Sequence, residues 1–357
     1  MSKFISRLFV IFAWTILLFL FPFLSKLPIF SRAEKSLTIF SWGDSFDPRV
    51  IEAFEKETGI KIHLNAYSSN EELLVKLRAT KGKGYDLIVP SDYVIPFLSE
   101  EGLLEELQRE KLLFWSDLNP LLLGHAFDMN NRFSIPFQWE IFGFGYDKSY
   151  FTERPLISNW QTVFDPSLID YKITMINDPI ETLFIATHSL FGDIEKISTE
   201  QLTTIKGVLI EQKKWVEAYS DFRGDYFLAT KNCPLVVASS SYIVRSMRKF
   251  PFIGFTAPKG GYFISIENLA IPKASKKKEL VYQFLNYIYR PDALAQHTFT
   301  YGFFPVTLSA LEKVSSDPSL YDLLYLTREN RDKFFFTRLL ISQQQLRDFW
   351  IEIKSTY

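Results

Sequence analysis

The segment 37–64, LTIFSWGDSFDPRVIEAFEKETGIKIHL, decides the fold of this chain. Residues 37–42 read as a buried strand that ends in a loop. A helix is predicted to begin at Asp47 and to end at Gly59, because Asp is a favoured N-cap and Gly a favoured helix stop. Residues 60–64 have the composition of a second strand. A strand, a helix and a strand in this order predict a parallel pair joined by a helical crossover.

The same alternation continues beyond this segment. We expect a helix over 71–79, a strand over 85–90 and a helix over 94–100. The order β-α-β-α-β predicts a mainly parallel sheet with helices on both faces.

A second α/β region follows a long strand-like stretch at 133–147. It contains predicted strands at 173–176 and 235–238, with helices after Asp178 and near 199–216. Residues 263–271 are again strand-like and suit a return to the first region, followed by helices over 278–289 and 343–354. We therefore predict two α/β lobes joined by a hinge, residues 34–141 with 263–312 and residues 142–262 with 313–357. Clefts between such lobes are common ligand sites.

The N-terminal 33 residues have the pattern of a secretory signal. Lys3 and Arg7 precede an uncharged apolar run at 8–24, and the small residues Ser31 and Ala33 suit cleavage after Ala33. The run of 17 residues is long for a signal core and near the lower limit for a spanning helix, so an uncleaved anchor is the alternative. With either outcome we expect the rest of the chain to be periplasmic.

Composition excludes several classes of function. Of the 357 residues, 47% are hydrophobic and 23% charged, which is normal for a globular protein. The net charge is −1, and without the four basic residues of the first 33 it becomes −5, so nothing suggests nucleic-acid binding. The single Cys233 excludes an internal disulfide, and the four scattered histidines have no zinc-ligand spacing. We expect no cofactor and a monomer.

The stretch 177–184, NDPIETLF, places the carboxylates of Asp178 and Glu181 three residues apart across a proline. Asp at the N-cap, Pro at the first helical position and Glu at the third are typical of a helix start. A pair of carboxylates at one helix start also suits cation binding or, less well, acid-base catalysis. From this stretch alone the capping interpretation is favoured.

Several stretches together resemble the polyamine-binding proteins of ABC transporters, the spermidine/putrescine-binding family. They are Trp42 with its loop, FEKETGIKI at 54–62, YDLIVPS at 85–91, SIP at 134–136 and LAIP at 269–272. The resemblance covers roughly residues 37–294. It implies a two-lobed binding protein that closes on one ligand and delivers it to permease subunits driven by an ATPase.

The resemblance also implies a ligand site. Asp178 and Glu181 match family acids that bind ligand ammonium groups, and Asp44 and Glu267 match two further acids. The remaining candidates are aromatic or hydroxyl side chains at matching positions: Trp42, Ser91, Tyr93, Trp139, Ser239 and Phe303. For Trp139 and Phe303, packing in the core is an equal alternative.

The chain departs from the family at several of these positions. Family aromatic residues are replaced by Ser45, Ala238 and Ser265, and Glu140 stands where the family has a small residue. Compared with the family, the chain keeps the acidic residues of the ligand site but lacks several of its aromatic residues. We therefore expect a binding protein for a polyamine-like cation; the alternatives are the same fold with another ligand, a membrane-tethered sensor or an exported carboxylate hydrolase.

Overall fold

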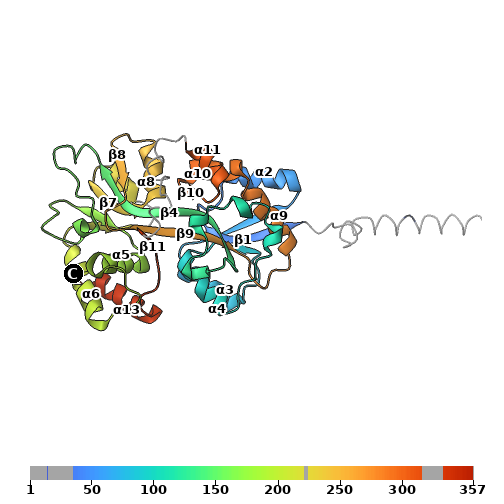
Figure 1. Cartoon of the computed structure of the whole chain (residues 1–357), viewed down its shortest axis with the longest axis horizontal. Coiled ribbons are helices and arrows are strands. Elements are labelled where there is room, and N and C mark those ends of the chain that lie inside the picture. Colours follow the sequence, from blue (N-terminus) through green and yellow to red (C-terminus); the bar gives the residue numbers. More distant parts are fainter. Residues whose placement is uncertain (1–13, 15–34, 221–223, 316–332, 357) are drawn as a thin grey trace, which may run out of the picture.

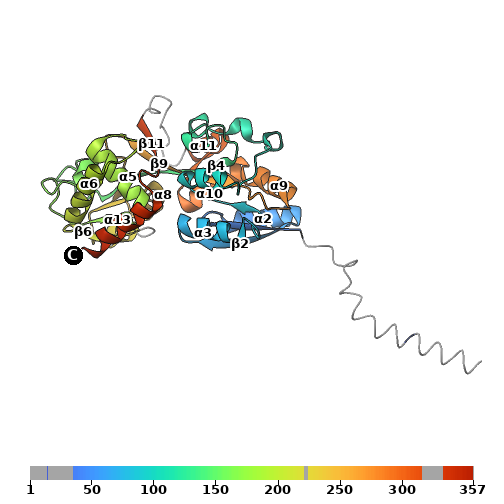
Figure 2. The same ribbon diagram turned by 90° about the horizontal axis from the view of Figure 1, so that it is seen from below.

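The computed structural model describes Trp14 and residues 35–220, 224–315 and 333–356. It has two α/β lobes that share one hydrogen-bonded sheet, with the strand order β2-β1-β3-β9-β4-β7-β5-β6 (Figure 1). The view from below shows the two lobes side by side, with β4 and β9 passing between them (Figure 2). The predicted two-lobed α/β fold is therefore confirmed, whereas the exact lobe boundaries stay a prediction.

The first lobe contains the predicted β-α-β-α-β unit. β1 (Ser36–Trp42) pairs in parallel with β2 (Lys61–Tyr67) and with the short β3 (Leu87–Ile88). The crossover helices are α2 (Pro48–Thr58) and α3 (Asn70–Thr80). Asp47 caps α2 by accepting the Arg49 amide proton, and Gly59 ends it with a φ of 70°. The sequence signals at both ends of this helix are thus confirmed.

Two long strands carry the chain between the lobes. β4 (Ser134–Asp147) and β9 (Tyr262–Ala270) run antiparallel, from the pair Ser134 and Ala270 to the pair Phe142 and Phe263. The mainly parallel sheet predicted for the first region is confirmed for β1, β2 and β3, whereas the direction of β4 relative to β9 was not predicted from the sequence. β10 (Phe304–Pro305) and β8 (Ile253–Thr256) also pair antiparallel with β4.

The second lobe is built on β7 (Leu235–Ser239), β5 (Ile173–Met175) and β6 (Val216–Tyr219), of which the sequence predicted only the first two. Helices α5 (Pro179–Phe191) and α6 (Thr199–Gln212) pack together, and the C-terminal α13 (Gln343–Ser355) lies against both (Figure 1). The remaining elements of the described residues are α4 (Ile95–Glu100), α7 (Gly224–Ala229), α8 (Ser240–Met247), α9 (Lys278–Ile288), α10 (Pro291–Tyr301), α11 (Leu308–Val314), β11 (Phe334–Phe336) and six short 3-10 turns.

The hydrophobic core continues across the lobe junction. One cluster of buried side chains extends from Phe40 and Leu73 in the first lobe through Phe142 on β4 to Leu183 and Phe349 in the second. Burial of these apolar side chains therefore stabilises the packing of the crossing strands as well as the core of each lobe.

The predicted N-terminal signal or anchor lies outside the described residues, except for Trp14. In the part of the chain that the structure describes, no helix is long and apolar enough to cross a membrane.

Gly143 on β4 has no room for a side chain, and this generates a prediction. A Cβ there would lie 2.6 Å from the Thr256 carbonyl oxygen and 2.6 Å from the Phe255 ring. We expect Gly143→Ala to lower the free energy of unfolding by about 1–3 kcal/mol, as overpacking does. Gly207→Ala in α6, where nothing lies within 4 Å of the added Cβ, should instead raise it by about 0.5–1 kcal/mol. Urea titrations of both variants measure the difference, and equal effects would contradict the steric argument.

Candidate functional site between the lobes

Glu267, on the crossing strand β9, is the centre of a polar cluster. The indole N–H of Trp42, at the end of β1, donates to its Oε2 at 2.8 Å, and the Ser91 hydroxyl donates to its Oε1 at 2.7 Å. The Trp42 ring lies against Tyr67, with ring centroids 4.6 Å apart. Three sequence-distant segments therefore hold one carboxylate, and a role of these three residues in ligand binding stays a prediction.

Burial raises the pKa of Glu267 to about 8. The hydrogen bonds from Ser91 and Trp42 oppose this rise, while the nearby carboxylates of Glu140 and Asp92 add to it. Asp92 is fully buried, and burial raises its pKa to about 8 as well. Near neutral pH the Glu267 carboxyl group therefore carries a proton for much of the time, and a nearby cation would favour its release.

Asn70 connects this cluster to Tyr93. Its side-chain N–H groups donate to the Ser91 hydroxyl at 2.9 Å and to the Tyr93 hydroxyl at 2.7 Å. Burial raises the pKa of Tyr93 well above its usual range, and the charges of Asp178, Glu71 and Glu181 raise it further. The acids at the start of α5 in the second lobe thus lie near a phenol of the first lobe. Sequence reasoning missed Asn70, which directly precedes the helix predicted over 71–79.

The predicted helix cap at Asp178 is confirmed. One carboxylate oxygen, Oδ1, accepts hydrogen bonds from the amides of Ile180 at 2.8 Å and Glu181 at 2.9 Å. These bonds orient the Asp178 side chain at the edge of the second lobe. A role of Asp178 and Glu181 in ligand binding is compatible with this cap and stays a prediction.

A second group of polar residues lies near Glu267. Burial raises the pKa of Glu140 on β4. The hydroxyls of Ser241 and Ser239 oppose this rise, because their hydrogen bonds favour the charged form of the carboxyl group. The Ser239 and Ser241 hydroxyls lie 3.0 Å apart. Burial also raises the pKa of Tyr242, and the charge of Glu140 adds to this rise. Asp44 forms an ion pair with Arg245 of α8 at 3.4 Å. Neither Tyr242 nor Arg245 was predicted from the sequence.

We call the set Trp42, Asp44, Asn70, Ser91, Tyr93, Glu140, Asp178, Glu181, Ser239, Tyr242, Arg245 and Glu267 the interlobe site. Its members come from both lobes and from both crossing strands.

Two predicted residues lie elsewhere. Trp139 is buried in the core of the first lobe, where its indole N–H donates to the Pro305 carbonyl at 3.0 Å and its ring packs on Phe304. Phe303 is also buried and lies parallel to the ring of His297, at a centroid distance of 6.1 Å. These contacts favour the packing alternative for both, because each side chain already has a structural role.

Three of the departures from the family pattern lie on or beside β4, the strand that carries Glu140. Glu140 lies directly opposite Ser265 in the β4–β9 register, and Ala238 pairs with Gly143. One position without the family's aromatic ring is therefore next to the added carboxylate.

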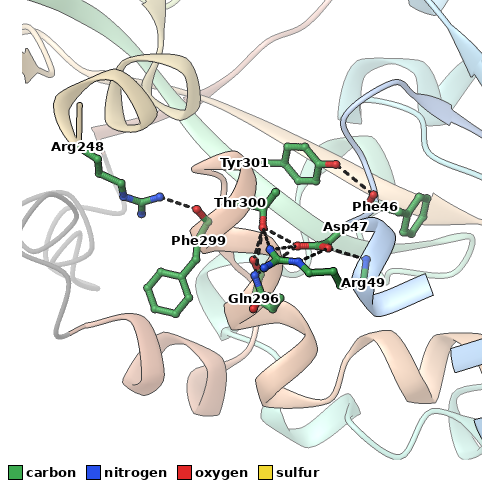
Figure 3. Close-up of polar contacts among 8 residues, drawn as sticks. All are labelled: Phe46, Asp47, Arg49, Arg248, Gln296, Phe299, Thr300 and Tyr301. Carbon is green, nitrogen blue, oxygen red and sulfur yellow. Dashed lines mark hydrogen bonds and ion pairs between the residues drawn. The ribbon is translucent and has the colours of Figure 1, made fainter. Parts of the chain in front are cut away.

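A buried Asp47 network fixes α10 on α2 beside this site (Figure 3). The Asp47 carboxylate accepts from the Arg49 guanidinium at 2.7 Å, and Arg49 also donates to Thr300 at 2.8 Å. Burial alone would raise the pKa of Asp47, but the hydrogen bonds from Arg49 and Thr300 lower it far below its usual range. The end of α10 is therefore held firmly against the start of α2.

Comparisons with known proteins agree with this geometry. The model of the bacterial extracellular solute-binding protein family matches residues 49–321. A spermidine/putrescine-binding periplasmic protein of Escherichia coli is 29% identical over 299 residues, which cover 81% of this chain and 83% of the relative. A putrescine/agmatine-binding protein of Pseudomonas aeruginosa is 24% identical over 342 residues, covering 90% and 93%.

Among solved structures, a putative spermidine/putrescine ABC transporter protein of Listeria monocytogenes superposes with a TM-score of 0.81 at 26% identity. The match covers 90% of this chain and 100% of that one. The resemblance stated from the sequence is thus confirmed, and the chain belongs to the bacterial extracellular solute-binding protein family.

Proposed function

We propose that this protein is the substrate-binding component of an ABC importer and binds a polyamine-like cation in the interlobe site. The observation that carries the proposal is that carboxylates from different parts of the fold lie in the interlobe site. Glu267 on β9 accepts a hydrogen bond from Trp42, and Asp178 and Glu181 at the start of α5 lie near Tyr93. The polyamine-binding relatives support the same ligand class.

The chemistry of the site suits such a ligand. Carboxylates gathered between two lobes repel each other and lose hydration when the lobes close, so they need a neutralising cation. An ammonium group offers charge-assisted hydrogen bonds to carboxylate oxygens. The faces of Trp42 and Tyr93 are suitable for a cation or for the methylene groups between cations.

Transport follows from closure of the two lobes. Ligand contacts from both sides favour the closed state, as in other hinge proteins, and the closed form is the one we expect the permease subunits to recognise. We infer an exported monomer, either cleaved after Ala33 or held to the membrane by its N-terminal segment. A binding role rather than catalysis is favoured because Asp178 and Glu181 share one helix start and no nucleophile motif accompanies them.

The paired acids give the first test of this function. We expect Asp178→Asn with Glu181→Gln to weaken binding of the best of putrescine, spermidine and spermine by at least about tenfold, the effect of losing roughly 1.4 kcal/mol. Asn retains the helix cap, so folding should be preserved. The matched control is Glu200→Gln, which removes an exposed acid from the start of α6.

Isothermal calorimetry on residues 34–357 measures all three proteins. Unchanged affinity in the double variant would contradict the role of the pair. If the folded wild type binds none of the three polyamines, the ligand class is wrong, and the same fold serves another solute.

Proton release on binding gives a second test. Because the pKa of Glu267 is raised to about 8 without ligand, a bound cation should lower it and release a fraction of a proton at pH 7. Affinity should then rise between pH 6 and about 8, since the unliganded protein progressively loses the proton that the cation must displace.

Calorimetry in buffers of different ionisation enthalpy measures the released protons directly. Glu267→Gln, which has no proton to release, should abolish most of the effect. A wild-type protein that releases no protons on binding would show that Glu267 does not face the ligand.

A further inference from the structure

Arg245 places a guanidinium group of the protein itself in the interlobe site. It projects from α8 in the second lobe, lies 3.4 Å from the Asp44 carboxylate of the first lobe, and stacks over the Tyr242 ring at 4.8 Å. Its side chain is 27% exposed, against 55% for Asp44. The cation is therefore the less exposed member of an ion pair that joins the lobes.

The stem of Arg245 is confined by a close approach between the lobes. Gly302, at the end of α10, has a φ of 80°, and a Cβ there would lie 2.4 Å from the Ser241 carbonyl oxygen and 3.3 Å from Cγ of Arg245. The Asp47 network holds the end of α10 (Figure 3). The approach of Gly302 to Ser241 places the start of α8 against that end. The guanidinium is thus directed at Asp44 by packing as well as by charge.

The positive charge of Arg245 also acts on two other ionisable side chains at this end of the site, Glu140 and Tyr242. It favours the ionised form of Glu140, whose pKa burial raises, and it opposes the rise in the pKa of Tyr242. Glu140 Oε2 is buried and has no hydrogen-bond partner among the described residues. A cation tethered within the protein competes with a ligand ammonium group at high effective concentration.

We propose, resting on the proposed function above, that Arg245 is a specificity-determining residue that occupies the Asp44 end of the interlobe site and restricts the ligand to a short diamine. Glu267, Asp178 and Glu181 remain for the two ammonium groups of such a ligand. A third ammonium group would meet the guanidinium. Ser265 and Ala238 offer no aromatic face for the longer methylene chain of a triamine.

The experiment compares the affinities for putrescine and spermidine of two variants of Arg245, one that removes its charge and one that keeps it. Arg245→Met removes the charge but keeps an unbranched stem to pack beside Gly302 and Tyr242, and Arg245→Lys keeps the charge. Arg248→Met is the control, because Arg248 lies one turn further along and donates to the Phe299 carbonyl at 2.7 Å (Figure 3).

We expect the wild type, Arg245→Lys and Arg248→Met to bind putrescine at least about tenfold more tightly than spermidine, and Arg245→Met to reduce this ratio by about tenfold, as expected for removing one nearby like charge. Circular dichroism confirms that each variant is folded. Arg245→Ala provides a second neutral variant if the Met side chain unfolds the protein.

Two outcomes overturn the inference while leaving the proposed function intact: a ratio that Arg245→Met and Arg245→Ala do not change, or tighter binding of spermidine than putrescine by the wild type. Absence of binding to both amines in every variant overturns the proposed function itself, so the two failures are distinguishable.

Discussion

The antiparallel pairing of β4 with β9 is the constraint on which the rest of the structure depends. The two strands form the middle of the sheet, connect the lobes and carry Glu140 and Glu267 on neighbouring strands. A shift of their register by one residue would turn every side chain to the other face. The core of both lobes and the acids of the interlobe site are therefore fixed by the same set of backbone hydrogen bonds.

The interlobe site brings several carboxyl groups close together, and their mutual repulsion has to be reduced. Glu267 and Asp92 are both buried deeply enough to have pKa values near 8. Asp44 is paired with Arg245, whose charge also lies near Glu140. The protein thus uses three means of reducing repulsion between acids: protonation, hydrogen bonds from Trp42 and Ser91, and an internal cation. A bound ligand would have to replace part of this arrangement.

Much of the fold could be predicted from the sequence because its signals are local. The cap at Asp47, the stop at Gly59 and the cap at Asp178 each depend on residues within one helical turn, and all appear where predicted. The antiparallel direction of β4 and β9 was missed because strand direction depends on pairing between distant segments. β6 was missed because it has only four residues, three half-buried and one exposed, which carry a weak pattern.

The candidate site was predictable only where it follows the family pattern. The family pattern named Trp42, Ser91 and Glu267 as candidates, and the structure joins them by hydrogen bonds. Arg245 and Tyr242 carry no local signal, since a charged residue on a short helix usually faces solvent. The place of Arg245 depends on distant segments, namely Asp44 and Gly302. Trp139 and Phe303 had suitable positions along the chain, but packing in the first lobe turns them away.

The hydrogen bond from Trp42 to Glu267 joins residues 225 positions apart, and it has a consequence for how the chain folds. β1 is made early in synthesis, whereas the crossing strand β9 is made about two hundred residues later. Contacts of such long sequence separation slow folding, because the chain loses entropy before they form. This contact therefore cannot form until β9 has been made, so the polar cluster around Glu267 is assembled late in synthesis.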